Sequence, residues 1–329
     1  MDLWTPYVDP HRDLVWPVRL DPRGVRGPTR GQARGRAWRR CARGWYVPAS
    51  VDPDDVEQRI LEQAVRVVGT EGALSGWAAL RWRGAAYFDG HRPDGSLAPV
   101  DLLRLGGGAS LPPGPARFSG AQLAPTETEL VRGVPCATVE RSLFDVMRFA
   151  GSVRQAVVAA DMVSAAGLLS IAGLAEFVSH KHAWEGVPQT REAVALASDD
   201  SRSPQESWLR LCWLLDAELP PPVCNQPVFD LEGRLLGYPD LLEPTLGVVG
   251  EYDGAHHLRT AQRAQDLARE DRMRAAGLEY FSVVGGELRH RDRVAQRMRD
   301  TWRRARRRTT EERGWTLEPP PWWGQRRSA

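Results

Sequence analysis

The periodicity of apolar residues changes in a fixed order between residues 203 and 307, and this order constrains the fold more than any other feature. The region opens with a helical pattern whose first residues form a capping box, Ser203 with Glu206, and place proline at the first helical position. Three strand-like segments, a helix, a strand and a last basic helix follow. The predicted ranges are a helix at 203–217, strands at 225–230, 234–242 and 246–253, a helix at 260–277, a strand at 278–284 and a helix at 288–307.

This order, α-β-β-β-α-β-α, predicts an α/β domain with a mixed central sheet over residues 201–310. Residues 1–134 read as a separate region with short helices at 54–69 and 73–84, the second capped by Ser75, and with short strands. Residues 135–200 read as a helical connector in which Thr138 begins a helix. Residues 311–329 are predicted to be a disordered tail.

Charge is distributed unevenly along the chain. The formal net charge is +2, but residues 1–50 carry ten Arg and four Asp, and residues 285–329 carry thirteen Arg and six acidic residues. The two ends therefore contribute +6 and +7, which leaves −11 for the middle. Basic ends around an acidic centre are typical of a nucleic-acid-binding protein whose middle holds carboxylates. A genome of high GC content would give a similar excess of arginine, since Lys181 is the only lysine.

Several classes of protein are excluded by what the sequence lacks. No apolar run is long enough to span a membrane, and the start, MDLWTPYVDPHRDLVW, does not have the layout of a signal peptide. The four cysteines are scattered without a CxxC pair, which indicates a reducing compartment rather than a disulfide framework or a zinc knuckle. We therefore predict a cytoplasmic protein without a membrane partner.

Residues 237–257, GYPDLLEPTLGVVGEYDGAHH, set carboxylates beside an apolar run. Glu251 and Asp253 share one face of their strand because side chains alternate with period 2. If this strand pairs with the preceding one through the turn at 243–245, Asp240 lies near one end of the hairpin, and Glu206 can approach the same point. Carboxylates that converge raise each other's pKa unless a cation lies between them.

Two interpretations of these carboxylates remain open. In the first, Asp240, Glu251 and Asp253 bind Mg²⁺ or Mn²⁺, which suit all-oxygen sites, and the ion activates water beside a phosphodiester. In the second, the segment is a hairpin with an Asp253-Gly254 turn, and Glu206 serves only to cap its helix.

The spacing of Pro239-Asp240 and Glu251-Tyr252-Asp253 resembles the motif of the PD-(D/E)xK nuclease superfamily, whose core is an α-β-β-β-α-β arrangement. EYDGAHH followed by AREDRMRAAGLEYFSVV is similar to a bacterial family related to very-short-patch-repair (Vsr-type) endonucleases, over residues 203–308. The resemblance implies a restriction-endonuclease-like fold and metal-dependent hydrolysis of DNA.

The usual lysine of the motif is replaced by Asp253 here. Histidine serves in the Vsr-type branch, so the resemblance gives His257, or His256, the role of general base. The missing lysine also fits an inactive nuclease that still binds DNA.

The first half has a second resemblance. GPTRGQARGRAWRRCARGWYVP, EQRILEQAV and GALSGWAAL resemble AbiEi-type abortive-infection antitoxin proteins, and ATVERSLFDVMRFAG resembles a segment that follows in the same actinobacterial architecture. This resemblance implies partial winged-helix character in the N-terminal region and a toxin as a further partner.

The arginine clusters give candidate DNA contacts, since arginines bind phosphate without reading sequence. Alternatively they are surface positions, and the last cluster suits the C-terminal dipole of a helix. The leading hypothesis is a Mg²⁺-dependent DNA endonuclease acting in phage defence or DNA repair, and the alternative is a non-catalytic, antitoxin-like DNA-binding regulator. The candidate DNA-binding residues are Arg34, Arg36, Arg39, Arg40, Arg272, Arg303, Arg304 and Arg307.

Overall fold

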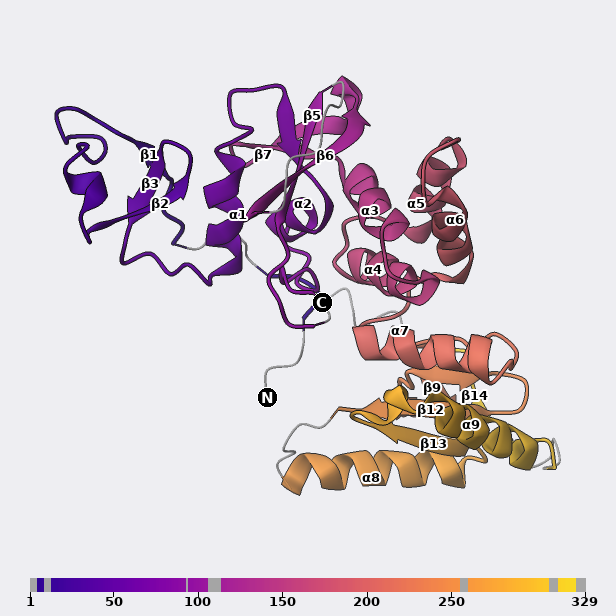
Figure 1. The fold of residues 1–329 in the computed structure, drawn as a ribbon. Helices are drawn as coiled ribbons and strands as arrows, with labels where there is room; N and C mark the ends of the chain where they lie inside the picture. The colour runs from indigo at the N-terminus through magenta and orange to yellow at the C-terminus, as the bar shows by residue number, and fades with distance from the viewer. Residues whose placement is uncertain are drawn as a thin grey trace. The chain divides into compact units, whose positions relative to one another are not determined.

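The computed structural model describes residues 5–8, 13–92, 94–105, 114–254, 260–307 and 313–323. The protein is a mixed α/β protein with several separate sheets (Figure 1). It divides into two compact units, Met1–Asp199 and Asp200–Ala329. The helices predicted as a connector at 135–200 therefore belong almost entirely to the first unit. No helix in the described ranges is long and apolar enough to cross a membrane.

A five-stranded sheet organises the first unit. Its strand order is β6-β5-β4-β8-β7, and the central strand β4 pairs antiparallel with β5 and parallel with β8. Helices α1 (Val56–Ala64) and α2 (Gly76–Trp82) pack on it through Ile60 and Trp82, among others. The strands are β4 (Gly72–Leu74), β5 (Val100–Leu105), β6 (Ala116–Leu123), β7 (Thr128–Val131) and β8 (Val134–Ala137).

Four helices complete this unit and lie together beside the sheet (Figure 1). The first three begin as their sequence indicates, because the hydroxyl groups of Thr138, Ser152 and Ser170 each accept a backbone N–H of the first turn. The fourth lies in a segment for which the sequence predicted no separate element. Their bounds are α3 (Val139–Arg148), α4 (Val153–Ala165), α5 (Ile171–Ser179) and α6 (Val187–Leu196).

The N-terminal end of the first unit is a small antiparallel sheet of order β1-β3-β2. In the described residues before Val56 the helical structure is limited to the 3₁₀ turn η1 (Gln32–Arg34). The described residues of this part therefore form a three-stranded sheet with one 3₁₀ turn, and the partial winged-helix character stays a prediction. The strands are β1 (Val18–Arg19), β2 (Trp38–Ala42) and β3 (Trp45–Pro48).

In the second unit, strand β12 (Val248–Asp253) lies between antiparallel β11 (Leu241–Glu243) and parallel β13 (Glu279–Val284). The second and third predicted strands do pair as a hairpin, β11 with β12, with Glu243 opposite Val248, but the turn spans residues 244–247 instead of 243–245. Helices α7 and α9 pack on one face of this sheet and α8 on the other (Figure 1). Their bounds are α7 (Pro204–Leu211), which continues as a π-helical turn (Cys212–Asp216), α8 (Thr260–Ala275) and α9 (Arg291–Ala305).

The second predicted strand, 234–242, is in fact two strands in two sheets. Its first part, β10 (Leu235–Gly237), pairs with β9 (Val228–Asp230), while its second part is β11. Pro239 lies in the break and has no N–H to donate to a ladder, which explains the interruption.

The prediction of a disordered tail over residues 311–329 is wrong for its middle. Trp315 and Thr316 form β14, which pairs antiparallel with β9. Trp315 is 3% exposed, and the ring of Trp323 stands edge-on to Phe229 at 4.8 Å between centroids. The apolar area that these tryptophans bury holds the segment in place.

Candidate functional site

Asp240 lies where the sequence placed it, at the end of the β11–β12 hairpin. Its Oδ2 accepts the backbone N–H of Tyr252 at 2.7 Å, which fixes the carboxylate against β12. Burial raises the pKa of Asp240 to about 7, and the neighbouring charges of Glu206 and Glu251 add to this effect, whereas the Tyr252 N–H and Arg269 act in the opposite direction. Asp240 is thus close enough to both Glu206 and Glu251 to be affected by their charges.

Glu206 lies in the first turn of α7 and performs the capping role that its sequence suggests. Its carboxylate accepts from the Ser203 hydroxyl and the Arg202 backbone N–H, at 3.0 and 2.9 Å. It also accepts from the side-chain amide of Asn225 at 2.7 Å. Capping and proximity to Asp240 therefore occur together, so the two interpretations of Glu206 do not exclude each other.

Glu251 lies on β12 and is 8% exposed. Its Oε2 accepts from the Arg269 guanidinium at 2.6 Å and from the Tyr280 hydroxyl at 2.5 Å. Burial, followed by the charge of Glu251, raises the pKa of Tyr280, so this hydroxyl stays a hydrogen-bond donor. The positive charge that balances Glu251 in this structure is supplied by α8.

Asp253 and His257 have no described contact with Asp240, Glu206 or Glu251. Asp253 ends β12 on an exposed position, and its carboxylate makes no hydrogen bond or ion pair with the part of the chain that the structure describes. His257, like His256, falls in the segment 255–259 and lies outside the described residues.

The carboxylates of the predicted metal site can be compared with what a metal ion requires. Carboxylate oxygens are the donors that a hard divalent cation prefers. Within the described ranges, however, no group of three or more His, Cys, Asp or Glu side chains is arranged to hold a metal. The described residues therefore offer oxygen donors of the type that Mg²⁺ or Mn²⁺ prefers but do not gather three of them at one point, and Glu251 is engaged by Arg269 and Tyr280.

The candidate DNA-binding arginines of the second unit lie on its helices. Arg272 on α8 and Arg307 after α9 are exposed, and neither is paired with a described residue. Arg303 pairs with Asp300 at 2.8 Å, and Arg304 lies 3.3 Å from Glu279. All four guanidinium groups are at the surface, where phosphate contacts could form.

The N-terminal arginines differ among themselves. Arg34 and Arg36 are exposed on and beside η1, and Arg40 is exposed on β2. Arg39 instead forms a two-bond ion pair with the buried carboxylate of Glu62, at 2.7 Å for each bond. Its hydrogen bonds to Glu62 raise the pKa of Arg39, so this side chain joins β2 to α1 and is the poorest DNA contact of the four.

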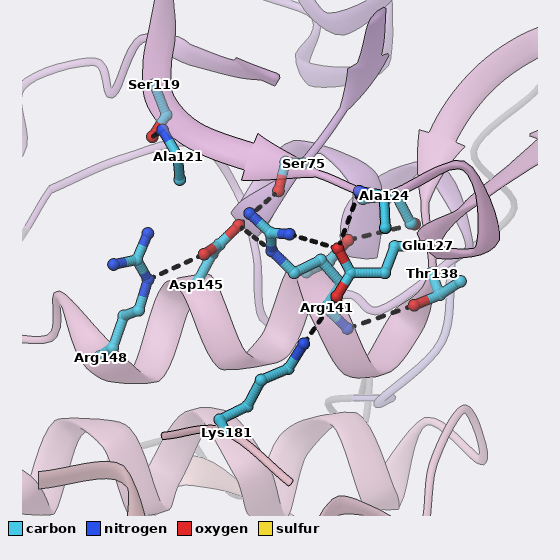
Figure 2. A network of polar contacts seen from close by, with 12 residues as sticks. Ser75, Ser119, Ala121, Ala124, Glu127, Thr138, Arg141, Asp145, Arg148 and Lys181 are labelled. Carbon is cyan, nitrogen blue, oxygen red and sulfur yellow. Dashed lines mark hydrogen bonds and ion pairs between the residues drawn. The ribbon is translucent and has the colours of Figure 1, made fainter. Parts of the chain in front are cut away.

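The sequence interpretation missed a polar network in the first unit (Figure 2). Arg141 of α3 is fully buried and pairs with Glu127 at 2.5 Å and with Asp145 at 3.0 Å. Arg148 pairs with the other oxygen of Asp145 at 2.9 Å, and Lys181 pairs with Glu127 at 2.7 Å. A signal was present in VERSLFDVMR, where charges recur at positions 141, 145 and 148, on one face of an otherwise apolar helix.

Comparison of the chain with protein-family models, with curated proteins and with solved structures found no match.

Proposed function

We propose that the second unit is a metal-dependent DNA endonuclease of the PD-(D/E)xK, Vsr-like type. The observation that carries this proposal is the burial of Asp240 beside the charges of Glu206 and Glu251, which together raise its pKa to about 7. Such a group accumulates negative charge as the pH rises, and a divalent cation relieves that repulsion. The site lies on the sheet β11-β12-β13, with α7 before it in the chain and α8 between β12 and β13, and the restriction-endonuclease-like core is part of the proposal.

In this proposal Asp240 and Glu251 hold Mg²⁺ or Mn²⁺, with Asp253 at the open end of β12 and Glu206 orienting the group from α7. When bound, the ion lowers the pKa of water and stabilises the leaving oxygen of a phosphodiester. His257 takes a proton from the attacking water, in line with the resemblance to the Vsr-type branch. The exposed arginines of α8 and α9 hold the DNA backbone.

A second candidate is favoured by the contacts of Glu251. A carboxylate that is held by Arg269 at 2.6 Å and by Tyr280 at 2.5 Å has its charge balanced without a metal ion. The site would then be a structural relic, and the protein would be a DNA-binding regulator of antitoxin type with a toxin as its partner.

Cleavage of supercoiled plasmid separates the two. The wild-type protein is compared with Asp240→Asn, which keeps an acceptor for the Tyr252 N–H but cannot ionise, in Mg²⁺, in Mn²⁺ and in a chelator. Glu232→Gln, on an exposed turn of the same unit, is the matched control. Metal-dependent nicking that persists in the control and disappears in Asp240→Asn supports the endonuclease. A folded wild-type protein that retards DNA in a gel but never nicks it supports the regulator.

A further inference from the structure

Two cavities meet in the first unit, beside the polar network of Figure 2. The smaller has a volume of about 300 Å³ and is lined by Ser75, Asp101, Asp145, Phe118 and Phe149, among others. The larger has a volume of about 510 Å³. They share Ser119 and Phe149 as lining residues, and the larger also includes Arg148, His182 and Trp184. A volume of this size is within the range of small-molecule sites.

The ion pairs behind these cavities hold more cations than carboxylates, and Glu185, which also lines the larger cavity, is exposed to solvent. Three permanent cations, Arg141, Arg148 and Lys181, are paired with only two carboxylates, Glu127 and Asp145. All three cations also lie over the ring of Trp184, at 4.9, 5.3 and 5.4 Å from its centroid. A buried excess charge is costly unless an opposite charge joins it, so the network favours an anion.

Arg148 is the cation best placed to receive that anion. The residue is 7% exposed and lines the larger cavity. Its Nε donates to Asp145 at 2.9 Å, while its two terminal nitrogens point away from Asp145 (Figure 2) and donate to none of the residues that the structure describes. A planar guanidinium with two free donors matches the geometry of a phosphate.

The smaller cavity has a different chemistry. Asp101 is paired with Arg117 through Oδ1, at 2.7 Å, so the pair is electrically neutral and its other oxygen remains an acceptor. Asp145 Oδ2 accepts from both Ser75 Oγ and Arg141 Nε, at 3.1 and 3.0 Å. Phe149 is 51% exposed, although it is a large aromatic residue. A neutral, planar group with N–H donors fits between such aromatic and carboxylate walls.

Together, the phosphate-binding chemistry of the larger cavity and the aromatic and carboxylate lining of the smaller one suit a single ligand, a phosphate joined to a planar heterocycle. We propose that the first unit binds a nucleotide, with its phosphate on the terminal nitrogens of Arg148 and its base against Phe149, facing the acceptors of Asp101. Phe149 stands at the junction of the cavities. The Arg148 guanidinium lies over one face of its ring, 3.9 Å from the centroid, so a base attached to a sugar phosphate would stack on the other face. The same chemistry is offered by a free mononucleotide and by one nucleotide of a single strand.

The test is calorimetric titration of the full chain with the four ribonucleoside 5′-monophosphates, with the matching nucleosides and with inorganic phosphate. We expect at least one monophosphate to bind, and its nucleoside and inorganic phosphate each to bind about 10-fold or more weakly, since each lacks one half of the contacts. A 5′-phosphorylated trinucleotide identifies the source of the ligand. Tighter binding of the trinucleotide indicates a strand, and equal binding indicates a free nucleotide.

Two variants make the test specific. Arg148→Gln and Phe149→Ala should each weaken binding about 10-fold, whereas Leu130→Ala, at an apolar position of the same unit that is 72% exposed, should not. Because Phe149 is itself exposed, Phe149→Ala stays folded and informative even if Arg148→Gln does not. The proposal is overturned if no monophosphate binds at millimolar concentration, if inorganic phosphate binds as tightly as the nucleotides, or if Phe149→Ala binds like the wild type.

Discussion

At the level of single residues, the acidity of Asp240 depends on its surroundings in the second unit. Its pKa rises from 3.8 to about 7, so the folded protein binds a proton here that the unfolded chain releases. Linkage then makes the free energy of unfolding fall as the pH rises from about 4 to about 7. Above that range the full cost of the buried charge is present.

Asp240→Asn should therefore stabilise the protein at alkaline pH. At pH 8 we expect the free energy of unfolding to increase by about 2–4 kcal/mol, because a pKa unit corresponds to about 1.4 kcal/mol. The difference should become small below about pH 3, where the aspartate is protonated in both states. Urea unfolding at several pH values measures it, and a difference that does not change with pH would contradict this account.

At the level of elements, strand β14 ties the end of the chain to the second unit. Trp315 is 3% exposed and packs with Val228, Val249 and Leu278. Trp315→Ala should lower the free energy of unfolding by about 3–5 kcal/mol, the usual cost of removing a buried tryptophan. Trp322→Ala, at a position that is 44% exposed, should cost less than about 1 kcal/mol. Equal effects in a thermal or denaturant melt would show that β14 does not hold the tail.

A second prediction at this level concerns the arginines on the helices and strands. It assumes the DNA binding that is proposed above. Arg307 is exposed after α9, so Arg307→Gln should weaken DNA binding for all sequences and reduce the slope of log K against log salt by about 1. Arg39 is already paired with Glu62, so Arg39→Gln should lower stability and leave the slope unchanged. Fluorescence anisotropy over a salt series tests both. The same slope for wild type and Arg307→Gln would remove this residue from the interface.

At the level of the whole molecule, each of the two units has its own sheets and its own apolar core. A chain starting at residue 200 should therefore fold alone and unfold cooperatively, because its core clusters need no residue of the first unit. Circular dichroism and calorimetry of this fragment check the expectation. A fragment that melts without cooperativity, while the full chain melts sharply, would show that the second unit depends on the first.

Local signals in the sequence were sufficient for the hairpin and for many of the helix starts. The β11–β12 pairing follows from the short turn at 244–247, and the caps Thr138 and Ser203 act within their own first turns. Such features depend on neighbours a few residues away. The sequence also brought Asp240 and Glu251 together, since both lie on one hairpin.

Contacts between segments that are distant in the sequence could not be predicted from such local signals. The sequence did not indicate that Arg269 and Tyr280 would hold Glu251, that Trp315 would add a strand beside β9, or that Lys181 would pair with Glu127. In each case the partners are many residues apart, and their meeting depends on how helices and sheets pack. By itself, then, the sequence determined a mixed α/β protein, many of its helix starts and the local pairing of the hairpin, because those rest on periodicity and on short-range hydrogen bonds. Only the tertiary structure decided which charges are paired and buried, because burial is a property of the packed chain.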